Sequence, residues 1–500
     1  MKVMWMILLL STHWIQCCTA VSEFYSSTDH MTQLIDIQKE FAQCFSDHIA
    51  ALESQVDLLK RAATVLGHNF DDTSKDKERF ISNPLSAYQL VRKLNNVWTT
   101  TRDIIEENRV TDTLKKLRSA AEKLPGADDV DGVVLGLLRL QEMYRLDPRN
   151  ISAFCEMKNN VTLDPDETFH IAVVSYQNEK VEFALLWMQE TLRKLSLGEN
   201  AIVSKEEVQD QLALFSCQLA STQDPLHVRD LPACYANTIE SMKTWDWTSK
   251  TINLFESQPM QNKYEALCTG KQKPQMKRKL VCRYRTANQM MYAPFKEEEE
   301  WHQPMVWRYH DFLSDREIDV IKRLARPKLS RAKVIDAVTG KRFSTAFRVS
   351  KSAWLSEDED PLIAQINQRI ADVTGLDLRT AEELQVANYG IGGQYEPHYD
   401  SKLSNDSDFQ FRGDRIATLL IYMSDVDVGG ATVFPTTGAA LLPKRGTAVL
   451  WFNLLENGNQ DNTTLHASCP VFVGNKWVAN KWIRAGGQEF RRKCSTVQSE

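Results

Sequence analysis

The chain has 500 residues, enough for two to four domains with a sizeable core. Its 60 basic and 66 acidic residues nearly balance, so the composition gives no general attraction to nucleic acid or to acidic surfaces. Beyond the first residues, no segment stays apolar for about 18 residues, the length that a membrane-spanning helix needs.

Residues 1–20 have the features of a cleaved signal peptide. Met-Lys precedes a short apolar stretch, Val3–Leu10, and the segment ends with the small residues Thr19-Ala20. We therefore expect a mature protein that is soluble and either lumenal or secreted. The last residues, Thr496–Glu500, are not an endoplasmic-reticulum retention signal, so retention there would need a partner.

Eight cysteines follow Ala20, and an oxidising compartment makes disulfides plausible, but spacing alone does not give their pairing. Four glycosylation sequons begin at Asn150, Asn160, Asn405 and Asn462.

Residues 28–68 predict a long helix, because apolar residues from Leu34 to Leu59 recur every three or four positions, close to a coiled-coil seam. Such a seam fits either one face of a helical bundle or a self-association surface. The helical pattern continues over Leu90–Leu117 and is broken by Pro125-Gly126. We assign residues 21–135 to an N-terminal helical dimerisation domain.

Residues 136–245 contain short helix pairs. Thr168–Tyr176 and Val181–Leu195 resemble one helix-turn-helix unit of the tetratricopeptide type, and Val203–Ala220 with Leu231–Lys243 could form a second unit. A concave surface of such repeats commonly binds extended peptides. A plain helical spacer is the alternative interpretation.

Residues 246–300 predict a polar linker. We expect its basic run, Lys271–Lys279, and its acidic run, Glu297–Glu300, to form solvated surface. His302 and His310 follow, and because neither has a carboxylate two residues further on, we expect both to be structural.

Residues 301–500 predict β structure with many turns. Leu384–Tyr389 alternates, Ile416–Met423 and Thr447–Leu455 are nearly continuous apolar runs, and Val471–Val473 with Lys476–Ile483 flank Gly474-Asn475, a hairpin-type dipeptide. Short strands punctuated by glycine and proline favour a sandwich or jelly roll, which can hold a metal in its mouth. The whole chain is thus expected to be a multidomain α+β protein.

One short motif, His398-x-Asp400, carries the clearest chemistry. A strand points alternate side chains to one face, so residues two apart can bind one ion. His466, 68 residues after His398, could complete a set of two imidazoles and one carboxylate, as in non-haem Fe(II) oxygenases. Zinc on the same residues is the alternative, although neither Cys469 nor Cys494 has the paired spacing of a thiolate zinc site.

Lys476 begins an alternating strand ten residues after His466. If it points into a barrel, its buried ammonium needs an anion, and the carboxylate of an oxo-acid co-substrate would supply one. A tight hairpin at Gly474-Asn475 would place His466 and Lys476 on opposite faces. We therefore expect a bulge near Cys469-Pro470 to shift the register.

Several segments together resemble the α-subunit family of collagen prolyl 4-hydroxylases. The resemblance is dense over residues 300–500 and looser over the rest of the chain. The segments that carry it are Leu384–Gly390, Gly393–His398, Tyr422–Val426, Gly429–Pro435, Gly474–Val478 and Gly487–Arg492.

The resemblance implies a protein of the endoplasmic-reticulum lumen with an N-terminal coiled-coil and dimerisation region, a tetratricopeptide-like peptide-binding domain and a C-terminal double-stranded β-helix (jelly roll). It implies a dioxygenase that hydroxylates peptidyl proline at C4 with 2-oxoglutarate and O2, giving succinate and CO2. It also implies Fe(II) as the metal and ascorbate as the reductant that keeps it active.

The resemblance further implies roles for single residues. Fe(II) would be held by His398, Asp400 and His466, and the distal carboxylate of 2-oxoglutarate by Lys476. The other positions that it implies are Tyr389, Thr432 and Trp482 in the co-substrate pocket, and Tyr176, Trp187, Tyr395 and Arg415 as contacts of the substrate peptide.

The family also implies disulfides between Cys268 and Cys282 and between Cys469 and Cys494. Its members assemble with protein disulfide isomerase as β subunit in an α2β2 tetramer. Such a partner would account for the missing retention signal.

Two positions depart from the family. Arg484 stands where the family has a histidine near the iron, and it could act there as a second carboxylate clamp or slow the reaction. Val181 and Glu182 stand where the family has a pair of tyrosines that bind proline-rich chains, which predicts weaker or different peptide binding. The alternatives are therefore a secretory-pathway prolyl hydroxylase for non-collagen proteins, or a catalytically weak or non-catalytic peptide-binding subunit.

Overall fold

The computed structural model describes residues 23–67, 84–106, 109–149, 151, 162–223, 231–243, 263–271, 279–286, 294–335, 342–401 and 412–495. The chain divides into two compact units, Met1–Asp29 together with Gly126–Glu500, and His30–Pro125. The expected signal peptide, the sequons at Asn150, Asn160 and Asn405, and most of the basic run of residues 271–279 lie outside the described residues. None of the described helices is long and apolar enough to cross a membrane.

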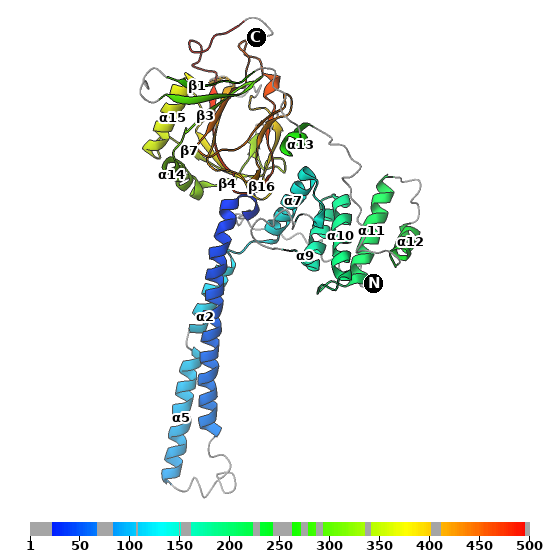
Figure 1. Cartoon of the computed structure of the whole chain (residues 1–500). Helices are drawn as coiled ribbons and strands as arrows, with labels where there is room; N and C mark the ends of the chain where they lie inside the picture. Colours follow the sequence, from blue (N-terminus) through cyan, green and yellow to red (C-terminus); the bar gives the residue numbers. More distant parts are fainter. Residues whose placement is uncertain are drawn as a thin grey trace. The chain divides into compact units, whose positions relative to one another are not determined.

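The unit of residues 30–125 consists of long helices (Figure 1). Helix α2 (Thr28–Gly67) has 40 residues and confirms the helix expected over residues 28–68. Helices α5 (Pro84–Glu106) and α6 (Arg109–Ala121) follow, and α6 lies along α2, since His48 Nδ1 is 3.0 Å from Thr113 Oγ1.

The next helices form a second helical layer with its own core. They are α7 (Ala127–Tyr144), α9 (Pro165–Gln177), α10 (Val181–Ser196), α11 (Lys205–Gln223) and α12 (Leu231–Lys243). Helix α9 begins at Pro165, three residues before the expected Thr168, because Asp164 and Glu167 form a capping box around Pro165. The α9–α10 and α11–α12 pairs confirm the expected helix pairs.

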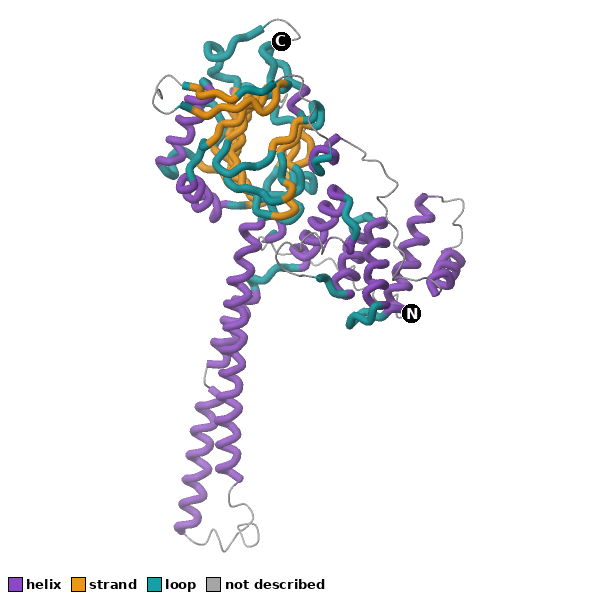
Figure 2. Tube along the Cα trace, in the orientation of Figure 1, coloured by secondary structure: helices purple, strands orange, loops and turns teal. Residues whose placement is uncertain are grey.

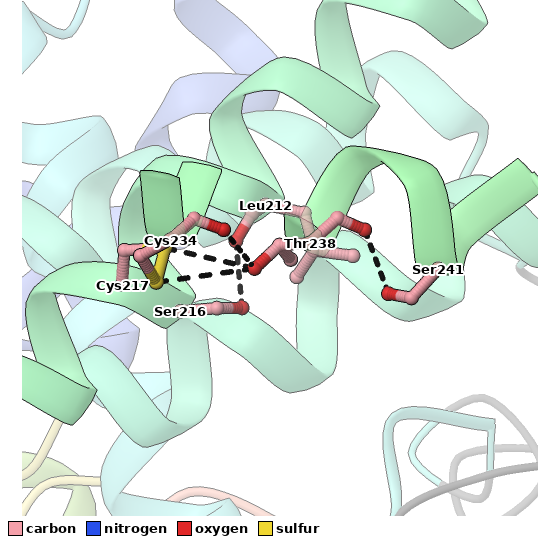
Figure 3. The surroundings of a disulfide bond; sticks show 6 residues. All are labelled: Leu212, Ser216, Cys217, Cys234, Thr238 and Ser241. Atoms are coloured by element: carbon pink, nitrogen blue, oxygen red, sulfur yellow. Dashed lines mark hydrogen bonds between the residues drawn. A yellow bond between two sulfur atoms is a disulfide. The ribbon is translucent and has the colours of Figure 1, made fainter. Parts of the chain in front are cut away.

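A disulfide that the sequence left open joins the second pair. Cys217 of α11 and Cys234 of α12 have Cα atoms 5.9 Å apart, and Thr238 Oγ1 donates to the carbonyl of Cys234 beside them (Figure 3). The bond fixes α12 against α11.

The C-terminal part contains the strands, drawn in orange in Figure 2. Nine of them form one sheet in the order β1-β2-β3-β14-β10-β17-β8-β7-β4, and four form a second in the order β13-β12-β15-β9. The bounds are β1 Cys282–Arg285, β2 Phe295–His302, β3 Met305–His310, β4 Ser330–Arg331, β7 Lys351–Leu355, β8 Leu384–Asn388, β9 Tyr395–His398, β10 Arg415–Tyr422, β12 Thr432–Phe434, β13 Ala439–Leu441, β14 Ala448–Phe452, β15 His466–Ser468 and β17 Trp477–Arg484.

Two smaller pairs complete the strands, β5 (Val334–Ile335) with β6 (Arg342–Phe343), and β11 (Val428–Gly429) with β16 (Val471–Val473). Short helices are α13 (Lys263–Cys268), α14 (Asp315–Ala325) and α15 (Pro361–Thr374), with three-residue 3-10 turns at Phe24–Ser26, Arg326–Lys328 and Asn462–Thr464.

Residue alternation assigns each strand face to one of two cores. In β10, Ala417, Leu419 and Ile421 pack with the apolar faces of α14 and α15. Leu420 and Tyr422 point the other way, into a second core with Phe434 and Trp451 from both sheets. Central strands are therefore buried on both faces, which explains why all five residues of β8 are buried although its sequence alternates.

The acidic run does not form solvated linker surface. It lies in β2, where Glu297 is 2% exposed and its carboxylate pairs with Arg283 at 2.6 Å and Arg285 at 3.0 Å. His310 lies 2.6 Å from Glu298, which fits its expected structural role. Counter-charges on neighbouring strands thus allow this run to join the sheet.

Candidate metal and co-substrate centre

The three expected metal ligands meet at one point of the smaller sheet. His398 ends β9 and His466 begins β15, and the two residues face each other across this antiparallel pair. Asp400 lies two residues beyond β9, with carboxylate oxygens 3.8 Å from His398 Nε2 and 3.6 Å from His466 Nε2. One potential ligand atom of each residue lies within 4.8 Å of the others.

The hydrogen bonds of both histidines leave the ligand nitrogens available. His398 Nδ1 donates to Glu396 O at 2.7 Å, and His466 Nδ1 donates to Thr464 O at 2.9 Å. Because Nδ1 donates in both residues, Nε2 is the atom of each imidazole that remains to bind a metal. Burial and the neighbouring His466 lower the pKa of His398 to about 3, so this imidazole stays neutral. The donor set therefore fits Fe(II).

Two further side chains orient Asp400. Thr418 Oγ1 donates to its Oδ2 at 2.7 Å, and Asn453 Nδ2 donates to Thr418 at 2.9 Å. Burial by itself would raise the pKa of Asp400, but the two histidines, Arg415 and the Thr418 hydrogen bond together hold that pKa below its usual range. The carboxylate is therefore ionised and held in one orientation.

Lys476 is an inward cation, as the strand pattern predicts. Its side chain is 1% exposed, and its ammonium donates to Gly430 O and Ser468 Oγ at 2.6 Å each. Among the described residues no carboxylate pairs with it, and burial lowers its pKa to about 7. A carboxylate ligand would satisfy this charge.

Tyr389 and Thr432 also belong to this pocket. Lys476 Nζ lies 4.9 Å from the centroid of the Tyr389 ring. Thr432 accepts a hydrogen bond from Tyr422 Oη at 2.7 Å and pairs with Ser468 across β12 and β15. The expected co-substrate residues at these two positions thus lie together beside Lys476.

The expected hairpin at Gly474-Asn475 is wrong. β16 pairs with β11, whereas β17 pairs with β10 and β8 in the larger sheet. The chain crosses from one sheet to the other here, which turns Lys476 inward without a hairpin. An irregularity in the β15–β9 pairing does occur, but it lies between His466 and Ser468 rather than at Cys469-Pro470.

Arg484 forms an ion pair with an acidic residue, Glu382. Its Nη2 lies 2.8 Å from Glu382 Oε1, and the same carboxylate accepts two bonds from Arg415, at 2.6 and 2.7 Å. Arg415 and Arg484 face each other across β10 and β17. Trp482, opposite Thr418 on β10, lies under Arg415 with 3.9 Å between guanidinium carbon and ring centroid.

The expected peptide contacts fall into two groups. Near the metal ligands, Tyr395 stacks on His398 with 3.5 Å between ring centroids, and Arg415 is hydrogen-bonded to Glu382. Arg348, which was not among the expected contacts, lies over the Tyr395 ring at 4.7 Å. In the helical layer, Tyr176 stacks on Phe215 at 3.8 Å and donates to Gln218. These positions are compatible with contact to a peptide.

Trp187 does not fit a peptide contact. It is 0% exposed and donates from Nε1 to Gln141 at 2.9 Å inside the helical core. This expectation is corrected because the face of α10 that carries Trp187 packs inward. At the start of α10, Val181 is half-buried and Glu182 is exposed.

The expected disulfides are also corrected. The structure joins Cys268 to Cys469, whose Cα atoms are 5.5 Å apart, and leaves Cys282 and Cys494 exposed and unpaired. The reason is the packing of α13 onto the smaller sheet, where Tyr264 and Leu267 contact Val433 and Ala467. Cys282 lies instead on β1, at the far edge of the larger sheet.

Sequence reasoning missed the supporting residues of the site, namely Arg348, Glu382, Asn388, Thr418, Asn453 and Ser468. No motif marks a residue whose role is to hold another side chain, because its partner can lie anywhere in the sequence. Glu382 alone offered a signal, as an acidic residue just before a buried strand.

Comparison with known proteins agrees with this geometry. The family described as "Prolyl 4-Hydroxylase alpha-subunit, N-terminal region" matches residues 27–153, and the 2OG-Fe(II) oxygenase superfamily matches residues 384–484. The chain is similar to prolyl 4-hydroxylase subunit alpha-1 of Rattus norvegicus, with 39% identity over 97% of both chains. It is 37% identical to subunit alpha-2 of Gallus gallus over 99% of both, and 32% identical to subunit alpha-1 of Caenorhabditis elegans over 96% of this chain and 92% of that one.

Solved structures also match. The viral collagen prolyl hydroxylase of Paramecium bursaria Chlorella virus-1 is 30% identical over 36% of this chain and 96% of its own, with a TM-score of 0.29. From the similarity to relatives over nearly the full length, the chain belongs to the prolyl 4-hydroxylase α-subunit family and is a 2-oxoglutarate-dependent Fe(II) dioxygenase.

Proposed function

We propose that this chain is the catalytic α subunit of a procollagen-type prolyl 4-hydroxylase. It hydroxylates C4 of peptidyl proline with 2-oxoglutarate and O2, giving succinate and CO2. The observation that carries this proposal is the buried Lys476, whose ammonium has no acidic partner among the described residues, in the same barrel as the His398, Asp400 and His466 ligand set.

Different side chains bind the metal, bind the co-substrate and exclude water. Iron and 2-oxoglutarate supply the oxidising chemistry when bound, and ascorbate keeps the iron reduced. His398, Asp400 and His466 hold the metal, and Lys476 holds the distal carboxylate of the co-substrate with Ser468 and Thr432 beside it. Apolar residues around the site, including Trp451 and Phe434 against His466, exclude water.

The Glu382–Arg415–Arg484 cluster has a positioning role in this proposal. A guanidinium already bonded to a carboxylate is less available as a clamp for a second one. We therefore assign Arg484 to the support of Arg415 rather than to direct contact with 2-oxoglutarate.

The assembly and location follow from the same proposal. Cleavage after Ala20 would deliver the chain to the endoplasmic-reticulum lumen, and protein disulfide isomerase would retain it as β subunit of an α2β2 tetramer. We propose helical dimerisation over 21–135, peptide binding over 136–245 and the dioxygenase over 301–500. The expected connector over 246–300 contains α13, β1 and most of β2, which pack with or join the sheets of the dioxygenase part.

Release of labelled CO2 from 1-labelled 2-oxoglutarate tests the function. The chain is co-expressed with the isomerase and assayed with Fe(II), ascorbate and (Pro-Pro-Gly)10, beside a His466→Ala control. Peptide-stimulated release that is lost in the control is expected. No release from folded, iron-loaded protein would contradict the proposal and favour a non-catalytic subunit.

A second function, hydroxylation of non-collagen proteins in the secretory pathway, is favoured by the helical layer. The exposed Glu182 and the half-buried Val181 replace aromatic surface at the start of α10, and Trp187 is buried. CO2 release without stimulation by (Pro-Pro-Gly)10, together with mapping of hydroxylated prolines by mass spectrometry, would identify this case.

A further inference from the structure

One glycosylation sequon, Asn462-Thr463-Thr464, lies in the described part of the chain and close to the metal ligands. Its three residues form a 3-10 turn that ends two residues before His466, the first residue of β15. The other three sequons lie outside the described residues. A sequon in a surface loop of a protein that enters the secretory pathway is an acceptor for N-linked oligosaccharide.

The turn separates the two side chains that define the sequon. Thr464 is 1% exposed, and its Oγ1 donates to Asp461 O at 2.7 Å. Asn462 is exposed, and its Oδ1 accepts from Gln460 Nε2 at 3.2 Å. No described residue accepts from Asn462 Nδ2, the atom to which an N-linked sugar is attached. This nitrogen is therefore left to solvent.

A sugar on Asn462 Nδ2 would leave the turn intact. The side-chain carbonyl oxygen remains an acceptor after the amide nitrogen is substituted, so the hydrogen bond from Gln460 persists. The turn itself is held by Asp461, whose Oδ1 accepts from Thr463 N at 2.8 Å and whose O accepts from Thr464 N at 3.0 Å. None of these bonds uses Asn462 Nδ2, so the folded chain can carry the modification.

The same turn contacts the segments that carry the metal ligands. His466 Nδ1 donates to Thr464 O at 2.9 Å. Tyr399, which lies between the first two ligands in the chain, donates from Oη to Asn462 O at 3.4 Å. A group attached to Asn462 therefore stands at the rim of the metal site.

We propose that Asn462 carries an N-linked glycan at the rim of the metal site. The inference rests on the proposed location in the endoplasmic-reticulum lumen, and the donor is an oligosaccharide linked to a lipid pyrophosphate. The bond between Asn462 Nδ2 and C1 of the first sugar forms, while the bond from C1 to the pyrophosphate oxygen breaks. Nδ2 loses one proton, and the lipid pyrophosphate is the leaving group.

The glycan also limits where a partner protein can bind. A bulky, hydrophilic group on the outside of the turn prevents a second protein from packing flat against it. The proposed isomerase subunit would therefore bind elsewhere on the chain. The turn at Asn462 would stay open to solvent in the complex.

Glycopeptide mapping tests the site without requiring turnover. The full chain is co-expressed with protein disulfide isomerase in a eukaryotic secretory host. The native complex is treated with peptide N-glycosidase in heavy-oxygen water, which converts a glycosylated asparagine to an isotopically labelled aspartate. Mass spectrometry is expected to find the label at Asn462, with the isomerase still bound to the chain.

Four variants show whether the sequon directs the modification. Asn462→Gln removes the acceptor nitrogen and Thr464→Val removes the hydroxyl of the sequon, so complete loss of the glycan is expected in both. Thr464→Ser keeps the sequon and the hydroxyl that donates to Asp461 O, so the glycan should remain. Asn459→Gln is the matched control, because Asn459 is an exposed asparagine of the same loop outside any sequon, and the glycan at Asn462 should be unchanged.

The outcomes separate this inference from the proposed function. An unlabelled Asn462 in a chain that begins at Val21 would overturn the site alone, because removal of residues 1–20 shows entry into the secretory pathway. A chain that keeps residues 1–20 and carries no label would overturn the proposed location together with the site. Label that appears only after denaturation would contradict the open position of the turn, and label that persists in Thr464→Val would contradict the sequon. Label at Asn462 without any CO2 release would support the site and count against the catalytic proposal alone.

Discussion

The charge of Lys476 depends on its surroundings more than that of an ordinary lysine. Its two hydrogen-bond acceptors, Gly430 O and Ser468 Oγ, are uncharged, and burial lowers its pKa to about 7. The ammonium is therefore present below pH 7 and is lost as the pH rises through that value. Because a carboxylate binds the charged form, a rise in pH weakens the binding of 2-oxoglutarate.

We expect the dissociation constant of 2-oxoglutarate to rise between pH 6.5 and 8.5, by at most about tenfold per unit above the pKa. Anaerobic titration of Fe(II)-loaded protein, followed by its absorption spectrum, measures it. Lys476→Arg is the control, since arginine stays charged throughout this range and its constant should be flat. Equal slopes for both proteins would contradict the assignment.

A second prediction for a single residue concerns the Glu382 carboxylate. Its side chain is 13% exposed; burial would raise its pKa, but Arg415 and Arg484 together lower that pKa, so the group is ionised. Glu382→Gln removes the negative charge that both buried guanidinium groups contact, which costs about 3 kcal/mol. Arg484→His, which restores the residue of the family, keeps the Arg415 pair and costs about 1 kcal/mol.

Thermal unfolding tests which of the two variants loses more stability. The midpoint should fall further for Glu382→Gln than for Arg484→His. The reverse order would show that Arg484, and not Glu382, holds this cluster together.

The residues of the site that sequence could predict share one property. His398 and Asp400 are two residues apart on a strand, and Lys476 begins an alternating strand, so local geometry was enough to relate each to the barrel interior. The disulfide partner of Cys469 could not be predicted that way, because the packing of α13 on the sheet decides it.

Among the elements, the start of α2, with Ser27 directly before it and Thr28 as its first residue, has a direct connection to the co-substrate pocket. Ser27 Oγ donates to Asn388 Oδ1 at 2.7 Å, and Thr28 Oγ1 donates to Tyr389 O at 2.8 Å. Asn388 Nδ2 in turn donates to Lys476 O at 3.2 Å. The residues that follow the expected signal peptide thus support the backbone on both sides of the pocket.

Removing both hydroxyls, in Ser27→Ala with Thr28→Val, should raise the dissociation constant of 2-oxoglutarate about threefold through this loss of support. The constant is read from the same anaerobic titration. Thr64→Val is the control, since the Thr64 hydroxyl donates at 2.9 Å to Lys60 O within exposed α2. An unchanged constant in the double variant would show that the segment does not position the pocket.

Element prediction succeeded where periodicity was long and failed where a turn decided the topology. The seam over residues 28–68 and the strand over residues 471–473 were placed to within a residue. The dipeptide Gly474-Asn475 has a hairpin-type sequence, and Gly474 does have φ 116°, yet the strands beside it join different sheets. A Gly-Asn turn has the same local preference whether the strands beside it pair with each other or join different sheets. Only the long-range strand pairing therefore decides whether such a turn forms a hairpin.

At the scale of the whole molecule, the unit of residues 30–125 leaves apolar surface uncovered. Helix α5 carries a stripe of exposed residues spaced by three or four, Leu85 (73% exposed), Tyr88 (60%), Val91 (68%), Leu94 (50%) and Trp98 (63%). Contiguous apolar surface of this kind marks an interaction site. A second copy of the chain is the occupant expected here, because the spacing of the stripe suits a helix with the same repeat.

Val91→Lys with Trp98→Lys would place two charges in this stripe. Light scattering of the full chain co-expressed with protein disulfide isomerase should then count one α chain per particle instead of two. Gln89→Lys adds a charge on the same helix outside the stripe and should leave two. Because Lys476 and the metal ligands lie in the other unit, peptide-independent CO2 release should persist in the double variant; two α chains per particle in that variant would place the self-association surface elsewhere.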